Sequence, residues 1–274
     1  MSARRANLGL FEPWSTLVRN FGLVRQLTRR DVIGRYRGSV FGVFWSFFNP
    51  LLLLVVYTFV FAHVFNARWG LPNEGKSEFA IVLFVGMIIH TLFAESANRA
   101  PSLVVGNANY VKKVVFPLEC LPWMAVGTAV FHALVSTLAL LLAQLFVLQT
   151  LPVTVIAFPL VLLVFLPAVV GTVWLLAATG VFVRDLQQAI GIITVALLFL
   201  APVFYPSSML PAKYRDLLLL NPLTFVIEQS RDVLIWGRWP NWTGLILYGL
   251  ASSLFAWLGL RWFQRTRAGF ADVL

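Results

Sequence analysis

Residues 29–65 place a group of arginines directly beside a long apolar stretch, and no linker separates the two. The segment reads RRDVIGRYRGSVFGVFWSFFNPLLLLVVYTFVFAHVF. Its apolar part, 40–65, contains no Asp, Glu, Lys or Arg, and His63 is its only residue that titrates near neutral pH. About 20 helical residues cross the ~30 Å hydrocarbon layer of a membrane. The segment therefore predicts a transmembrane helix that starts at the cytoplasmic edge of a membrane.

The composition supports a polytopic membrane protein, because 59% of the residues are apolar and only 12% are charged. Such values exclude a soluble domain or a disordered chain. The net charge of +10 would fit nucleic acid, but the basic residues cluster beside the apolar segments. Anionic lipids are therefore the expected partner, and no nucleic acid is expected. Cys120 is the only cysteine, so an intrachain disulfide is impossible, and we expect no metal site or cofactor.

Residues 8–38 combine arginines with apolar side chains at spacings of three and four, which predicts an amphipathic helix on the membrane surface. The arginines are Arg19, Arg25, Arg29, Arg30, Arg35 and Arg37. Each contributes ~1 kcal/mol of attraction to an anionic leaflet. The alternative is a solvated basic arm, which the apolar stripe makes less favourable. Three glycines spaced by four, Gly34, Gly38 and Gly42, permit either close helix contact or a bend into the span.

The apolar segments predict an all-α membrane protein with six transmembrane helices. The expected spans are 40–65, 79–98, 123–148, 153–183, 188–204 and 244–263. The chain 1–274 is then one transmembrane domain. It has a cytoplasmic amphipathic segment (1–39), the spans (40–263) and a cytoplasmic tail (264–274).

The basic residues fix the expected orientation, because loops on the cytoplasmic side are enriched in Lys and Arg. With both termini inside, the cytoplasmic segments contain fifteen of the 21 basic residues, namely Arg4, Arg5, Arg19, Arg25, Arg29, Arg30, Arg35, Arg37, Arg99, Lys112, Lys113, Arg184, Arg261, Arg265 and Arg267. The outer side contains Arg68, Lys76, Lys213, Arg215, Arg231 and Arg238.

Residues 206–241 contain three apolar runs that are each too short to cross a membrane, and Asn221-Pro222 and charged residues interrupt them. Counting this region as a seventh span would place the C-terminal arginines outside, against the charge rule. We expect a re-entrant helical hairpin that dips into the outer leaflet between the fifth and sixth spans. A simple surface loop is the alternative.

One phosphate-loop pattern occurs, GLPNEGKS at 70–77. The pattern binds nucleotide when it links a strand to a helix, whereas here it joins two expected spans and contains Pro72. No acidic strand end follows it to hold Mg²⁺. We therefore expect no nucleotide site, and the chain is not expected to be an enzyme.

Ionisable residues at membrane depth are few: His63, His90 and His132 stand singly, and Glu95 and Glu119 lie near the inner ends of spans. Each histidine favours a hydrogen-bonded packing role over a proton relay. Glu95 either faces a cavity or partner helix, or extends to the interface. An ion-coupled secondary flippase for lipid-linked oligosaccharide would need essential acids in mid-membrane. A membrane-embedded glycosyl transferase would need an acidic or metal-binding cluster.

Aromatic residues crowd the first expected span, and four of them, Trp45, Phe48, Tyr57 and Phe59, are candidates for lining a substrate path. Sugars stack their C–H faces on aromatic rings, so such a path would let a polymer slide. Ordinary packing and interfacial belts are the alternative.

Four blocks together resemble the membrane subunit of ABC-2 type polysaccharide exporters, most of all the O-antigen exporter permeases, with teichoic-acid and capsule exporter permeases close. The blocks are RDVIGRYRGSVFGVFWSFFNPLLLLVVYTFVF (30–61), NANYVKKVVFPLECLP (107–122), FVRDLQQAIGIITVALLFLAPVFYPSSMLP (182–211) and NPLTFVIEQSRDVLIWG (221–237). They cover nearly the whole chain in matching order, although the loop 68–77 matches no block.

The resemblance implies a homodimer in the bacterial inner membrane that binds two copies of a separate cytoplasmic ABC ATPase. It would export polyprenyl-diphosphate-linked polysaccharide, with O-antigen as the first expectation, to the periplasmic side. Three groups of residues receive implied roles. Arg25, Arg29, Arg30, Arg35 and Arg37 would lie near lipid phosphates and the ATPase; Asn107, Asn109, Tyr110, Lys112 and Lys113 would couple to the ATPase; and Tyr205, Pro206, Asn221, Pro222, Glu228 and Arg231 would belong to a periplasmic gate.

Overall fold

The computed structural model describes residues 11–60, 69, 76–112, 116–209, 211, 213, 218 and 221–274. Its helices are α1 (Glu12–Arg19), α2 (Phe21–Arg35), α3 (Trp45–Tyr57), α4 (Lys76–Leu103), α5 (Ala108–Val111), α6 (Cys120–Leu148), α7 (Phe158–Gly180), α8 (Leu186–Leu200), α10 (Pro222–Leu234), α11 (Trp242–Thr266) and α12 (Phe270–Val273). Within these ranges no strand is present, so the prediction of an all-α protein is confirmed.

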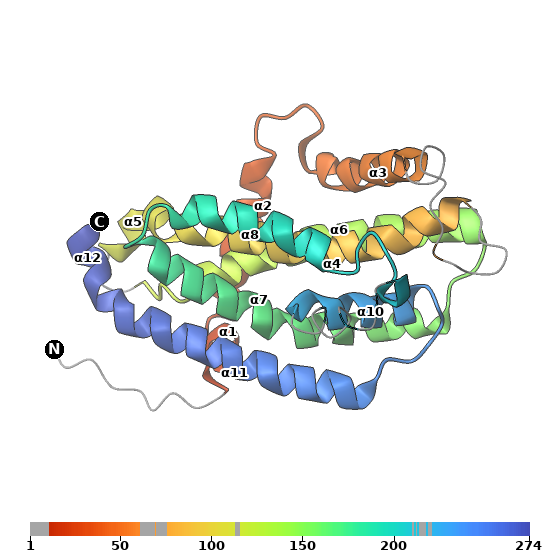
Figure 1. Ribbon diagram of the computed structural model, residues 1–274. Coiled ribbons are helices and arrows are strands. Elements are labelled where there is room, and N and C mark those ends of the chain that lie inside the picture. Colours follow the sequence, from red (N-terminus) through yellow and green to blue (C-terminus); the bar gives the residue numbers. More distant parts are fainter. Residues whose placement is uncertain are drawn as a thin grey trace.

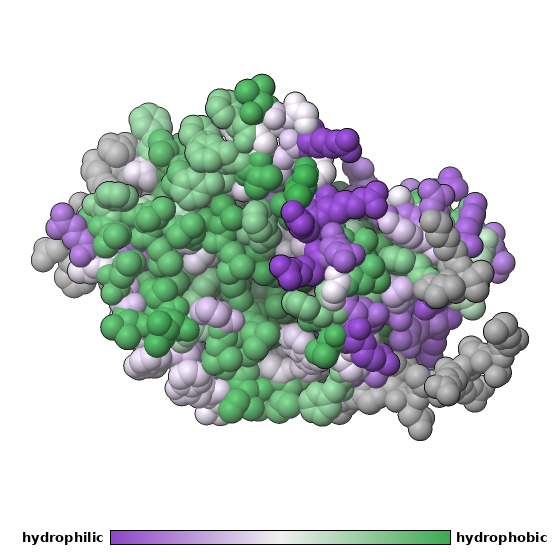
Figure 2. Space-filling model, turned by 180° about the vertical axis from the view of Figure 1, so that it is seen from behind, coloured by the Kyte–Doolittle hydropathy of each residue, from purple (hydrophilic) through white to green (hydrophobic). Residues whose placement is uncertain are grey.

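The long helices α4, α6, α7, α8 and α11 lie side by side, while α1 and α2 run across them (Figure 1). α5, α12 and the turn 181–185 lie at one end of the bundle, which we call the basic end (Figure 1). α10 lies toward the opposite end, which we call the α10 end. Figure 2 shows a wide hydrophobic surface over the bundle, with hydrophilic residues concentrated toward the basic end. This distribution fits a bundle that crosses a membrane.

α4 forms the centre of the bundle, because it packs against α6, α7, α8 and α10 and most of its side chains are buried. Small residues permit very close helix contacts around it. A Cβ at Gly180 would lie 2.3 Å from the Pro101 carbonyl oxygen, and a Cβ at Gly259 would lie 2.4 Å from the Gly171 carbonyl oxygen. Backbones that touch in this way are typical of helix packing in membranes.

Five helical stretches of the described chain are long and apolar enough to cross a membrane: Gly42–Val60, Glu78–Leu103, Cys120–Leu148, Val153–Gly180 and Trp242–Val273. α8 is shorter, because its 15 residues extend only about 22 Å. It ends where Ala201 turns extended (φ −99°, ψ 153°) before Pro202, as expected for a residue that precedes proline. Length therefore supports five of the six predicted spans.

Gly34, Gly38 and Gly42 lie where the chain bends between α2 and α3. Gly38 and Gly42 adopt φ values of +85° and +52°, and a Cβ on Gly34, Gly38 or Gly42 would meet nothing within 4 Å in the described chain. Positive φ is costly for residues that carry a Cβ. Of the two interpretations of this pattern, the structure favours the bend, which turns the chain from the crosswise α2 into α3.

Several predictions lie outside the described residues. These are His63, the glycines of the phosphate-loop pattern at 70 and 75, and Lys113. The predicted hairpin is described in part, as a short 3-10 turn, Ser207–Met209, and the helix α10.

Candidate functional site: an ion-pair network beside a cavity

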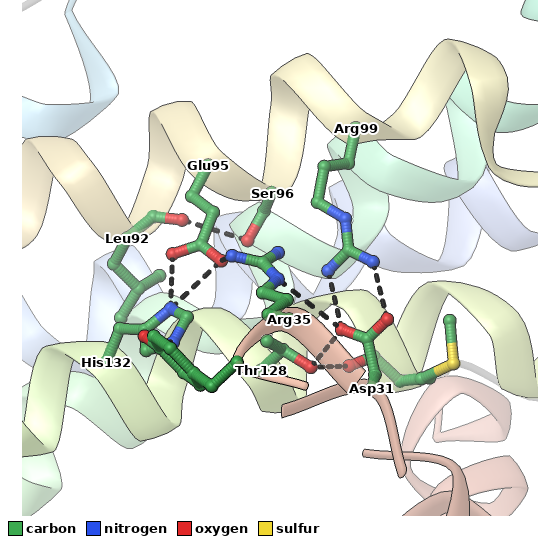
Figure 3. Close-up of polar contacts among 10 residues, drawn as sticks. Asp31, Arg35, Leu92, Glu95, Ser96, Arg99, Thr128 and His132 are labelled. Atoms are coloured by element: carbon green, nitrogen blue, oxygen red, sulfur yellow. Dashed lines mark hydrogen bonds and ion pairs between the residues drawn. The ribbon is translucent and has the colours of Figure 1, made fainter. Parts of the chain in front are cut away.

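Asp31, in the last turns of α2, connects this helix to two long helices (Figure 3). Arg99 of α4 donates two parallel hydrogen bonds to it, Nη1 to Oδ2 at 2.9 Å and Nη2 to Oδ1 at 2.8 Å. The Thr128 hydroxyl of α6 donates a third, to Oδ2, at 2.8 Å. Bidentate arginine–carboxylate pairs are among the strongest and most directional polar contacts in proteins.

Arg35, one turn after Asp31, pairs with Glu95, one turn before Arg99. Its Nη1 lies 2.6 Å from Glu95 Oε1, and its Nε lies 3.8 Å from Asp31 Oδ2. Each helix thus contributes an acid and, four residues later, an arginine, and each acid pairs with the arginine of the other helix. The two crossed pairs fix one alignment of α2 against α4.

His132 of α6 extends the network. Its Nδ1 lies 2.9 Å from Glu95 Oε2, and its Nε2 lies 3.1 Å from the Tyr36 hydroxyl. A neutral imidazole donates from one nitrogen and accepts at the other. We therefore assign the proton to Nδ1, which donates to Glu95, while Nε2 accepts from Tyr36. Both ring nitrogens of His132 are therefore hydrogen-bonded, as the packing role favoured by its sequence context requires.

The network balances its own charge, because Asp31 and Glu95 face Arg35 and Arg99. Burial opposes ionisation of Asp31, but the hydrogen bonds from Arg99 and Thr128 and the nearby guanidinium charges outweigh it. The pKa of Asp31 consequently lies below its ordinary value of 3.8. Asp31 is therefore ionised at neutral pH, as its bidentate pairing with Arg99 requires.

A cavity of about 290 Å³ adjoins the network between α3, α4 and α6. The charged Arg35 and Glu95, together with His132, form its polar wall, while Tyr57, Leu53 and Phe84 line it elsewhere. Glu95 therefore faces a cavity, one of the alternatives that the sequence left open. A site with a charged wall and an aromatic one can hold a polar molecule that also has apolar faces.

The four aromatic candidates do not share this cavity. Tyr57 lines it, whereas Trp45 and Phe48 pack together with ring centroids 5.8 Å apart, in a cluster with Phe41 and Phe44. Phe59 is 62% exposed at the end of the span. The structure therefore divides the predicted aromatic path into one cavity residue and three residues elsewhere on the first span.

The five arginines predicted for the membrane interface also separate. Arg35 belongs to the network, while Arg25, Arg29, Arg30 and Arg37 are exposed. Arg30 Nη1 lies 3.5 Å from the Tyr110 hydroxyl of α5, so α2 also approaches the loop between α4 and α6.

The predicted coupling residues lie in that loop, at the basic end. The Asn107 amide donates to the Leu103 carbonyl at 2.8 Å, and the Tyr110 ring stacks on Phe116 with centroids 4.2 Å apart. Asn109 and Lys112 are exposed. The loop is therefore braced on one side and presents polar groups on the other.

Arg231 of α10 is the most deeply buried charged side chain in the described chain, at 0% exposed. Its Nε and Nη2 donate to the carbonyls of Val82 (3.3 Å) and Val203 (3.1 Å), and its guanidinium lies 4.4 Å above the Trp69 ring. Glu228 lies 3.4 Å from Nη1. Burial lowers the pKa of Arg231 to about 10, and Glu228 opposes that fall, so the side chain stays charged at neutral pH.

The other predicted gate residues support the start of α10 and the turn before it. Asn221 caps the helix by accepting from the Leu223 amide at 2.9 Å, and Pro222 takes the first helical position. The Tyr205 hydroxyl donates to the Phe199 carbonyl at 2.9 Å, and Pro206 is buried.

Four members of the network were not singled out from the sequence: Asp31, Tyr36, Arg99 and Thr128. One signal was present, since the pattern acid-x-x-x-Arg occurs at 31–35 and again at 95–99, on two neighbouring helices. Among the described residues, no group of His, Cys, Asp or Glu side chains is arranged to hold a metal ion.

Residues 22–235 match the family of ABC-2 type transporters, and this match covers most of the chain. The chain belongs to the ABC-2 type transporter family. It is similar to the O-antigen export system permease protein RfbA of Klebsiella pneumoniae, with 28% identity over 93% of this chain and 95% of that protein. The RfbA protein of Myxococcus xanthus is 30% identical over 92% of this chain and 95% of its own length.

A more distant relative of this ABC-2 chain is the polysialic acid transport protein KpsM of Escherichia coli. It is 22% identical over 89% of this chain and 93% of its own length. Family membership and the apolar helices together make this ABC-2 chain a multi-pass membrane protein.

Proposed function

We propose that this protein is the membrane permease of an ATP-driven exporter that moves lipid-linked polysaccharide, most specifically O-antigen, across the bacterial inner membrane. The observation that carries the proposal is the crossed ion-pair network between the crosswise helix α2 and the spans α4 and α6. A helix that lies across the membrane edge and is bound to two spans can transmit motion from a cytoplasmic motor. The names of the similar permeases supply the substrate class.

The proposed topology has six crossings and both termini in the cytoplasm. α8 would be the fifth crossing, since it runs from the basic end toward the α10 end (Figure 1). Its 15 residues suffice if the segment after it completes the passage beside α10. The positive-inside rule assigns the basic end to the cytoplasm, which puts α10 on the periplasmic side as a gate element.

The energy for export would come from a separate ABC ATPase, two copies of which would bind a dimer of this chain. Arg30 of α2 approaches Tyr110 in the loop that contains Asn109 and Lys112, so the exposed arginines of α2 and these two residues would together form the docking surface. A motor can shift the permease only through contacts that differ in strength between two states. We place these contacts on α2 and on the loop 104–119.

In this proposal, the cavity beside the network belongs to the substrate path. Tyr57 and Phe84 would contact sugar faces, and Arg35 would meet a phosphate or hydroxyl group. Of the four predicted aromatic path residues, Tyr57 is the one that the cavity supports. Tyr57→Ala should therefore slow export far more than Phe59→Ala.

An ion-coupled flippase is the second candidate, and one observation favours it: Glu95 and His132 contact each other beside a cavity at membrane depth. Such a pair can carry a proton. Against it, the guanidinium of Arg35 lies 2.6 Å from Glu95 and already balances its charge.

Reconstitution into liposomes tests the two candidates directly. The purified chain, with and without a companion ABC ATPase, is supplied with fluorescent polyprenyl-diphosphate-linked polysaccharide, and its appearance on the far side is followed. Transport that requires the ATPase and ATP supports the proposal. Transport by the chain alone, driven by a pH gradient and abolished by Glu95→Gln, would replace it with the flippase.

A further inference from the structure

A second, larger hollow lies between α2 and the start of α6. Its volume is about 620 Å³ and its walls are almost entirely apolar. Val24 and Val32 of α2 and Val126, Val130 and Phe131 of α6 line it. We call it the α2–α6 groove. Its volume falls within the range of about 300–1,000 Å³ that holds small molecules.

Two buried polar atoms lie in this wall without a hydrogen-bond partner among the described residues: the hydroxyl of Thr28 and the indole N–H of Trp123. The Trp123 side chain is only 4% exposed. Both atoms are covered by protein, and Thr28 Oγ1 lies against the backbone of Gly127 in α6. A molecule in the hollow therefore meets the apolar surface of this wall and does not reach these two atoms.

The polar edge of the groove is positively charged. Arg25 and Arg29 line it, both are exposed, and neither forms an ion pair within the described part of the chain. They stand one helical turn apart, so their charges repel each other. Arg35 differs, because Glu95 pairs with it. The edge therefore attracts an anionic group that can lie between the two guanidinium groups.

We propose that the α2–α6 groove binds one anionic phospholipid from the leaflet at the basic end. The acyl chain lies along the apolar walls, and the phosphate lies between Arg25 and Arg29. Arginines at a membrane edge attract anionic lipid head groups, and apolar surface there attracts chains. This site is separate from the cavity that contains Tyr57, and it does not depend on which polymer is exported.

The lipid would complete the contact between α2 and α6. A Cβ at Gly127 would lie 2.7 Å from Thr28 Oγ1, so α2 already touches the α6 backbone at one end of the groove. Asp31 and Thr128 join the two helices again one turn further on, and the hollow lies beside these contacts. A bound phospholipid would fill it and hold α2 against the bundle.

Native mass spectrometry of the full-length chain, exchanged into mixed phosphatidylglycerol and phosphatidylcholine, tests the site. We expect one phosphatidylglycerol to be retained per chain. The double variant R25Q/R29Q should bind it about thirtyfold more weakly. The matched control R30Q/R37Q removes the same charge from α2 and the turn that follows it, outside the groove, and it should retain the lipid.

Two variants that leave the net charge unchanged distinguish binding in the groove from diffuse electrostatic attraction to the surface. Val130→Trp fills the hollow and should abolish retention, while Thr28→Val, which is nearly isosteric and alters a hydroxyl that the lipid does not reach, should leave retention unchanged. Equal loss in both arginine double variants, or retention of phosphatidylcholine as well as phosphatidylglycerol, would overturn the proposal. Displacement of phosphatidylglycerol by polyprenyl diphosphate at equal concentration would also overturn it, and would make the groove a substrate site.

Discussion

The two ends of α4 contact buried charge in different ways. At the basic end, Glu95 and Arg99 pair with side chains of α2, and each charged group of this network has an opposite charge within reach. At the α10 end, Arg231 reaches backbone carbonyls of Val82 and Val203, and its acidic neighbour Glu228 is 36% exposed. One contact joins side chains and the other joins a side chain to the backbone.

This difference suggests different mechanical roles. Ion pairs between side chains can change partners when helices shift, because rotamers change on the nanosecond scale. Hydrogen bonds to carbonyls end when the backbone itself moves. The network at the basic end therefore suits a joint that moves in each transport cycle, while Arg231 suits a fixed attachment of α10 to the bundle.

The largest expected effect follows from removing Arg231. Arg231→Leu leaves the Val82 and Val203 carbonyls without their donor and removes the contact with the Trp69 ring. We expect a loss of roughly 3–5 kcal/mol in the free energy of unfolding. Thermal unfolding in detergent, followed by tryptophan fluorescence, measures it. The control Arg238→Leu alters an exposed arginine nearby, and equal melting temperatures for the two variants would contradict the fixed attachment.

The second effect concerns the Asp31–Arg99 pair, whose side chains are 18% and 28% exposed. A double-mutant cycle with Asp31→Ala and Arg99→Ala should give a coupling energy of about 1–2 kcal/mol. Exchanging the charges in D31R/R99D should restore part of the stability. A transport measurement distinguishes this site from Arg231, because the D31R/R99D variant should fold and yet transport poorly. A coupling energy of zero would exclude the ion-pair network as a joint between α2 and α4.

Acidification tests whether Asp31 is ionised in the folded protein. The folded pKa of Asp31 is lowered, so its stabilisation is fully present above its ordinary value of 3.8 and is lost as the pH falls through the folded pKa. The difference in unfolding free energy between the wild type and Asp31→Asn should therefore be constant from pH 7 to 5 and shrink below about pH 4. A difference that grew on acidification would contradict an ionised Asp31.

A smaller effect is expected for Glu95→Gln. The amide still bonds to His132 but no longer carries the charge that pairs with Arg35, so about 1 kcal/mol of stability should be lost. Export should fall more than stability, because Arg35 then enters the cavity without its partner. His132→Gln, which removes the other neighbour of Glu95 and keeps its charge, is the matched control. Unaffected export in Glu95→Gln would remove the cavity from the path.

The smallest effect on stability is expected for Lys112→Glu, because Lys112 is exposed. The melting temperature should not change measurably, while ATP-dependent export and copurification with the ATPase should decline. Reversing an exposed charge at the other end, Arg238→Glu, should leave both unchanged. If Lys112→Glu retains normal coupling, the docking surface lies elsewhere.

The sequence predicted the long helices well, because apolar length is a local property. The expected span 79–98 lies within α4, and 244–263 lies within α11. α8 was expected to extend to 204, but Pro202 ends it at Leu200. Because proline disfavours a helical conformation in the residue before it, the sequence contained the signal for this helix end. The apolar residues after Pro202 nevertheless suggested a longer span.

The sequence predicted the site less well, because which helices are neighbours is not a local property. Arg35 was expected at a lipid or ATPase surface, and His132 appeared to stand alone. Both depend on α2 lying across α4 and α6. The repeated acid–arginine spacing at 31–35 and 95–99 was the one local trace of this contact, and it acquires meaning only when the two helices are paired.

The crossed pairing also restricts how α2 can move. The two pairs lie one helical turn apart on each helix, so both must break before α2 can change its alignment against α4. A small push on α2 is consequently passed to α4 through two points, and only a larger one would let the pairs change partners.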